Sequence, residues 1–200
     1  SVSFLQGMIV HHNQALIMSE LAPARTNSPS IIDLAGRIEA SQEDEMNFMD
    51  GWLEERGENV SMGMDHSMGM DHSMGMHVKM AGMATPQQLK QLEESDGTTF
   101  DRLFLNLMIN HHDGAIKMVA ELRKQSGSAY DPVLNEFVSD LVNDQGVEIE
   151  RMNGLLVGLS DDPRSGLKGG LKYAEEAILN LQLVKSLDKP VGFYLSLIHI

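Results

Sequence analysis

A fifteen-residue segment near the start of the chain occurs again one hundred positions later, and each copy holds a His-His pair between two methionines. Residues 4–18 read FLQGMIVHHNQALIM and residues 104–118 read FLNLMINHHDGAIKM, so eight of the fifteen positions are identical. Both histidines and both methionines are among the retained positions. Imidazole and thioether groups are borderline and soft metal ligands. The repeat therefore predicts a duplicated structure whose function depends on these side chains.

Apolar residues recur at helical spacing through both copies, and strand-like alternation is absent from the sequence. The pattern predicts long helices over about residues 3–21, 30–56, 98–124 and 131–156, a short helix from residue 85, and a last helix over about residues 171–187. Ser3 with Gln6, and Thr85 with Gln88, have the form of capping boxes. Residues 23–29 are expected to form a polar break. The predicted fold class is all-α.

The second helices of the two halves also match. Gln42, Glu45 and Met49 correspond to Gln145, Glu148 and Met152 at an offset of 103. Each half is then a helical hairpin, and two hairpins pack most simply as a ferritin-like four-helix bundle.

This predicts a duplicated bundle over residues 2–156, interrupted by a flexible Met/His-rich linker at residues 61–83. Residues 157–193 are expected to be a linker and a helical extension outside the bundle. Residues 195–200 resemble a translated sequencing adapter, so residues 194–200 are interpreted as an artefact. The natural chain is then expected to continue past about residue 193 into another domain.

The histidines and methionines of each copy share one helix face. Met8, His11, His12 and Met18 fall within an arc of roughly 120°. On the partner helix, the stripe containing Glu45, Met46 and Met49 should face them. We therefore expect one metal site in each half.

A structural role for these side chains is the alternative. Methionines at helical spacing are usually core residues. Burying an imidazole without partners costs about 1–3 kcal/mol, so the histidines need partners. Glu45 and Glu148 could satisfy them structurally, or could orient imidazoles that bind a metal. The sequence leaves both roles open.

The segment between the two halves is rich in methionine. Eight of the fifteen methionines fall between Met62 and Met83, and the hexapeptide SMGMDH occurs twice, followed by SMGMH. A run of this composition cannot bury a core, but it can wrap a soft ion, of which Cu(I) and the similar Ag(I) are the best matches. A low-complexity expansion without a role, or a methionine surface that binds peptides, is the alternative.

The bulk composition excludes several function classes. A net charge of −14 argues against nucleic acid and anionic membranes. No run of about 20 apolar residues is present to span a bilayer. The absence of cysteine excludes disulfides and thiolate sites, and the use of thioethers instead fits an oxidising, extracytoplasmic compartment.

The pattern FLxxMIxHHxxA, present at Phe4 and at Phe104, resembles domain-of-unknown-function family 305. The run from Gln42 to Leu53 is similar to the family's second helix, and the MATPQQL run at residues 83–89 to its central connection. The resemblance covers residues 2–156, and the Met-rich linker makes the chain similar to the family's periplasmic copper-binding members. It implies a ferritin-like four-helix bundle, export from a bacterial cytoplasm, and Cu(I)/Ag(I) binding linked to copper resistance.

The leading hypothesis is an extracytoplasmic copper-binding protein for sequestration or trafficking in copper resistance, periplasmic or secreted, and not an enzyme. Its expected cargo is Cu(I), with Ag(I) or Cu(II) as alternatives. Its expected partners are copper ions and a copper-export or acceptor protein, with no nucleic acid. Affinity should fall as the pH drops through about 6.5, where an ordinary histidine takes up a proton.

Two other functions are weighed. A ferritin-like di-metal oxidase needs Glu-x-x-His motifs, but Phe48 and Arg151 follow the two glutamates at that spacing. A protein-interaction scaffold that binds no metal is the second. The candidate metal ligands are Met8, His11, His12, Met18, Met46, Met49, Met62, Met64, His66, Met68, Met70, His72, Met74, Met76, His77, Met80, Met83, Met108, His111, His112, Met118 and Met152.

Overall fold

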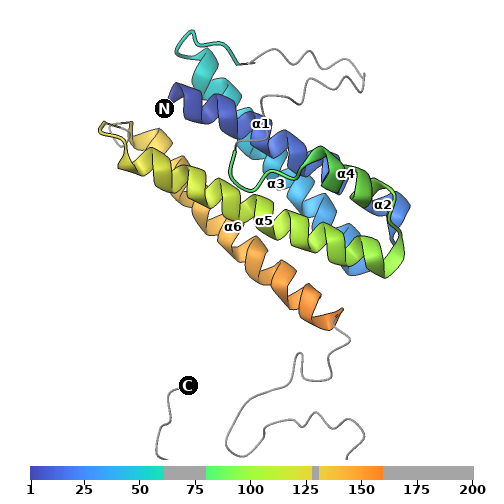
Figure 1. Ribbon diagram of the computed structural model, residues 1–200. Helices are drawn as coiled ribbons and strands as arrows, with labels where there is room; N and C mark the ends of the chain where they lie inside the picture. Colours follow the sequence, from blue (N-terminus) through green and yellow to red (C-terminus); the bar gives the residue numbers. More distant parts are fainter. Residues whose placement is uncertain (61–79, 128–130, 160–200) are drawn as a thin grey trace, which may run out of the picture. The chain divides into compact units, whose positions relative to one another are not determined.

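The computed structural model describes residues 1–60, 80–127 and 131–159, and all regular structure in these residues is helical (Figure 1). The helices are α1 (Val2–Ser19), α2 (Ala22–Arg25), α3 (Pro29–Glu54), α4 (Pro86–Glu93), α5 (Gly97–Lys124) and α6 (Pro132–Gly158). The expected all-α fold class is confirmed. The Met-rich residues 61–79 and the predicted C-terminal helix lie outside the described residues.

The four long helices form two antiparallel hairpins that pack together as a bundle. Helix α1 packs against α3, α5 packs against α6, and α1 also packs against α5 (Figure 1). The rings of Phe48 on α3 and Phe137 on α6 stack with their centroids 4.2 Å apart, which joins the second helices of the two halves. All these helices belong to one unit, Ser1–Leu159. No described helix is long and apolar enough to cross a membrane.

The helix starts agree only in part with the expected capping signals. Thr85 and Gln88 form the expected capping box, in which the Thr85 hydroxyl accepts from the Gln88 amide at 3.2 Å. The expectation for Ser3 was wrong, because α1 begins at Val2 and places Ser3 inside the helix. The polar break expected at residues 23–29 contains most of the short helix α2, which tolerates Pro23 because a proline in the first turn loses no helical hydrogen bond.

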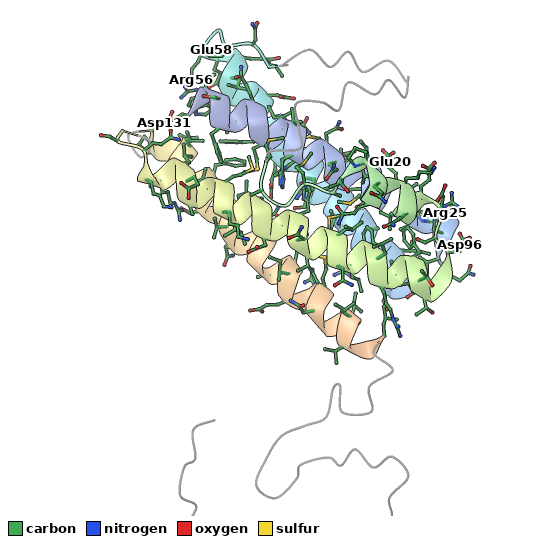
Figure 2. The ribbon with its side chains drawn as sticks, in the orientation of Figure 1. Glu20, Arg25, Arg56, Glu58, Asp96 and Asp131 are labelled. Carbon is green, nitrogen blue, oxygen red and sulfur yellow. The ribbon has the colours of Figure 1, made fainter. Side chains whose placement is uncertain are left out.

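Polar contacts join the two hairpins at both ends of the bundle (Figure 2). Asp131, which caps the start of α6, accepts from Trp52 Nε1 at 3.1 Å and from Arg56 Nη2 at 2.6 Å. The Arg56 guanidinium lies 3.7 Å from the centroid of the Trp52 ring. At the other end, Arg25 Nη1 lies 3.4 Å from Asp96 Oδ1.

The apolar core consists of two clusters, and along α1 the paired histidines fall between them. Leu5 and Met8 belong to one cluster, and Ala15 and Met18 belong to the other. The histidines thus occupy the middle of the bundle, flanked by apolar packing.

Candidate metal centre

The two His-His pairs meet where α1 packs against α5. The His11 and His111 rings lie with centroids 3.8 Å apart and planes inclined by 33°. His12 and His112 are completely buried, as is His11, and His111 is 1% exposed. The sequence led us to expect one site per half. The structure instead brings the equivalent histidines of both halves into direct contact.

Each imidazole is held through its Nε2 atom. His11 Nε2 lies 2.9 Å from the carbonyl oxygen of Ala81, and His111 Nε2 lies 2.8 Å from the carbonyl oxygen of His11. His12 Nε2 is hydrogen-bonded to Glu45, and His112 Nε2 lies 2.5 Å from Glu148 Oε2.

These contacts determine the tautomers of His11 and His111. A carbonyl oxygen can only accept, so Nε2 carries the proton and donates, and in the neutral ring the lone pair lies on Nδ1. A carboxylate accepts in the same way from His12 and His112. The Nδ1 atoms of all four histidines are buried and have no hydrogen-bond partner. Four ring nitrogen atoms are thereby left without a partner in the interior.

Burial keeps the central pair neutral. Desolvation, aided by the neighbouring His12 and His112, lowers the pKa of His11 to about 4 against the opposing effect of the Ala81 hydrogen bond. Desolvation and the proximity of His11 and His112 hold the pKa of His111 well below its usual value of 6.5. The expectation that proton uptake begins near pH 6.5 is therefore wrong for these two residues.

The buried methionines are divided between the two apolar clusters, and each cluster draws on both halves. Met8 and Met49 lie in one cluster, with Met46 and Met118 partly buried against it. Met18, Met108 and Met152 lie in the other. Met118, from the end of the second repeat, thus lies beside three methionines of the first half, and Met18, from the end of the first repeat, lies beside two of the second half. Equivalent methionines of the repeat lie in opposite clusters, an arrangement that was not foreseen from the helix faces alone.

Histidines and carboxylates alone do not complete a metal cage. Within residues 1–60, 80–127 and 131–159, no group of three or more His, Asp or Glu side chains is arranged to hold a metal ion. Glu45 and Glu148 are each hydrogen-bonded to a histidine. Any ion bound by these Nδ1 atoms would need further donors, and thioethers are the donors that the adjacent core contains.

Residues 80–84, which we call the crossover segment, pass directly over the central histidines. Gln14 fastens this segment by accepting from the Ala84 amide at 2.7 Å and donating to its carbonyl oxygen at 3.0 Å. At Gly114 a Cβ atom would lie 2.0 Å from the Ala81 carbonyl oxygen. Gly82, with φ of 81°, turns the segment where it touches α5.

The crossover segment is the part of the site that the sequence analysis did not identify. A signal was present, because Gln14 and Gly114 occupy equivalent positions of the repeat but differ. A glycine inside a helix usually requires a packing reason. The candidate ligands Met80 and Met83 lie in this segment and are partly buried. The remaining linker candidates, Met62, Met64, His66, Met68, Met70, His72, Met74, Met76 and His77, lie outside the described residues.

The bundle, the two His-His motifs and their carboxylate partners match a described family. The sequence pattern of the domain of unknown function DUF305 matches residues 1–156. The chain belongs to the DUF305 family. The resemblance predicted from the repeated motif is thereby confirmed.

Several DUF305 structures resemble this chain. One is a DUF305 protein of Streptomyces coelicolor, described as a candidate secreted protein, with 30% identity, a TM-score of 0.64, and coverage of 78% of this chain and 91% of that one. Another is CopM in its Cu(II)-bound form, with 26% identity, a TM-score of 0.61, and coverage of 80% and 97%. CopM structures with Cu(I) and with silver are similar at 26% identity and a TM-score of 0.57.

One curated sequence also matches locally. An uncharacterised protein of Acanthamoeba polyphaga mimivirus is 45% identical over 53 residues, which are 26% of this chain and 35% of that protein. The chain therefore matches only about a third of that relative's length. The similarity to CopM relates this DUF305 chain to a protein whose structures contain copper and silver.

Proposed function

We propose that this DUF305 chain binds Cu(I) and Ag(I) in an extracytoplasmic compartment, and that it sequesters or carries copper without acting as an enzyme. The observation that supports this most strongly is the set of four buried, unpartnered Nδ1 atoms at the centre of the bundle. An unpaired buried polar atom is costly in a protein interior, so these four atoms favour ligands that pair with them.

The Nε2 contacts fit this role. A histidine that binds a metal usually donates its other ring N–H to a carboxylate or a backbone carbonyl, which fixes the ring and raises its basicity. All four histidines already have such partners, in Ala81, His11, Glu45 and Glu148. We therefore propose that the ligating atoms are the Nδ1 atoms of His11, His12, His111 and His112.

The surrounding sulfur atoms suit a soft, monovalent ion. Soft thioethers select Cu(I) among the metals of the cell, while imidazole alone would equally suit zinc. The proposed sulfur donors are the fully buried methionines of the two clusters: Met8, Met18, Met49, Met108 and Met152. The structures of CopM with Cu(I) and silver support the same choice of cargo.

The test distinguishes Cu(I) binding by the bundle from Cu(I) binding by the Met-rich linker. Residues 61–79 are replaced by a Gly/Ser sequence of equal length, and Cu(I) is titrated against a chromophoric chelator. We expect this chain to retain Cu(I) binding, and a further H11Q/H12Q/H111Q/H112Q version to bind fewer Cu(I) ions. Unchanged Cu(I) binding in the four-histidine version, with unchanged far-UV circular dichroism, would reject the histidine centre.

A further inference from the structure

A partly open pocket lies at one edge of the bundle, beside the crossover segment. It has a volume of about 470 Å³, and its lining includes Phe4, Met80, Ala81, Met118 and Glu121. The two methionines are half-buried, unlike Met8 and Met49, which are completely buried. Both side chains are therefore partly accessible from solvent.

The Met80 and Met118 side chains both lie next to Gly7. A Cβ atom at Gly7 would lie 3.7 Å from Met80 Sδ and 3.9 Å from Met118 Cε. Any larger side chain at this position would extend into the space between them. Gly7 therefore leaves room for the two methionines, which come from the crossover segment and from α5.

The other repeat does not form this pocket. The residue equivalent to Gly7 is Leu107, which is 5% exposed, and the residue equivalent to Met118 is Met18, which is completely buried. The same helix face therefore borders an open pocket in one repeat and is filled by buried side chains in the other. The open pocket is the one that the crossover segment lines.

The pocket is also connected to the proposed histidine centre. Its lining residue Ala81 accepts the hydrogen bond from His11. Met118 packs against the cluster that contains Met8 and Met49. Met80 directly follows residues 61–79 of the Met-rich linker in the sequence, which keeps ions bound by those residues at a high effective concentration near the pocket.

We propose that Met80 and Met118 form a separate, solvent-accessible thioether site for a soft monovalent cation, Cu(I) or Ag(I), at the edge of the bundle. Two methionine side chains that line one pocket with a partly apolar wall are suited to these ions and not to Zn(II) or Mg²⁺. The inference rests on the proposed function and gives it a surface site distinct from the buried histidines.

The test uses the full chain labelled with ¹³C at the methionine methyl groups, with Ag(I) nitrate as the probe. We expect the Met80 and Met118 methyl resonances to shift together on addition of Ag(I). M80L should abolish the Met118 shift and M118L the Met80 shift. M83L, which changes a methionine of the same segment outside the pocket lining, should leave both shifts intact.

A second variant keeps both sulfur atoms and fills the space between them. G7L introduces the residue that the other repeat has at this position, and it should abolish both shifts while the helical circular dichroism signal is retained. If other methionines respond to Ag(I) but Met80 and Met118 do not, the surface site is rejected and the proposed function stands. If no methionine methyl resonance responds, both are rejected.

Discussion

The imidazole rings of His11 and His111 are in contact at the centre of the bundle, with centroids 3.8 Å apart. They are equivalent residues of the internal repeat. His111 also donates from Nε2 to the carbonyl oxygen of His11 at 2.8 Å. The two halves are thus joined through residues that the repeat retains. Substituting either histidine should therefore alter the packing of both halves.

Metal selectivity tests the role of sulfur. We expect Cu(I) and Ag(I) to bind more tightly than Zn(II), because a thioether offers little to Zn(II). Competition between Ag(I) and Zn(II) for the same sample, followed by metal analysis after dialysis, measures this directly. Zn(II) binding as tight as that of Ag(I) would show that the methionines are not ligands.

The carboxylates that hold His12 and His112 should affect metal affinity. The double variant E45Q/E148Q keeps an acceptor for each Nε2 atom but removes the charge that raises imidazole basicity. Loss of such a partner usually costs about 10–100-fold in metal affinity. Competition against a Cu(I) chelator measures the change, and E43Q, at an exposed position of the same helix, is the matched control. Equal Cu(I) affinities in the parent, E45Q/E148Q and E43Q proteins would assign Glu45 and Glu148 a purely structural role.

Stability of the metal-free protein should fall as the pH is lowered from 6.5 towards 4. In this range the unfolded chain takes up protons at His11 and His111, whereas the folded protein does not, because their pKa values are lowered by burial. Folding is then favoured above pH 6.5, and this contribution is lost as the pH falls. For His11, with a pKa near 4 instead of 6.5, the full effect is about 3 kcal/mol.

Urea unfolding at pH 7, 6 and 5 measures this slope. The variant H11Q/H111Q should have a shallower slope over the same range, because the two titrating groups are absent. A parent protein whose stability does not change between pH 7 and 5 would contradict the assigned state of these histidines.

The close contact between Gly114 and the crossover segment makes a second stability prediction. Replacing a helical glycine with alanine normally stabilises by about 1 kcal/mol. In G114A the new Cβ would lie 2.0 Å from the Ala81 carbonyl oxygen, and relieving such overlap typically costs about 1–3 kcal/mol. We expect net destabilisation in urea unfolding. The controls G146A and G154A, with no neighbour within 4 Å of the added Cβ, should be stabilised, and a stabilised G114A would show that the segment does not pack there.

Local sequence signals predicted the helices and the buried faces well, because both depend on residues within one segment. The His12–Glu45 contact followed from two stripes of one hairpin that were expected to face each other. The His11–His111 contact could not be predicted in this way, because it depends on how the hairpins pack. The role of Ala81 in the crossover segment could not be predicted either, because this residue contacts His11 through its backbone carbonyl, which any residue type has.

The most direct test of the central claim is to observe the ring nitrogens of the ¹⁵N-histidine-labelled full chain during an Ag(I) titration. We predict that the Nδ1 atoms of His11 and His111 are unprotonated before Ag(I) is added. The Nδ1 resonances of His11, His12, His111 and His112 should then move upfield on binding, while their Nε2 atoms keep their protons. The three linker histidines, His66, His72 and His77, serve as an internal comparison. A titration in which only the linker histidines respond, and the four buried Nδ1 resonances stay unchanged at saturation, would contradict a metal centre in the bundle.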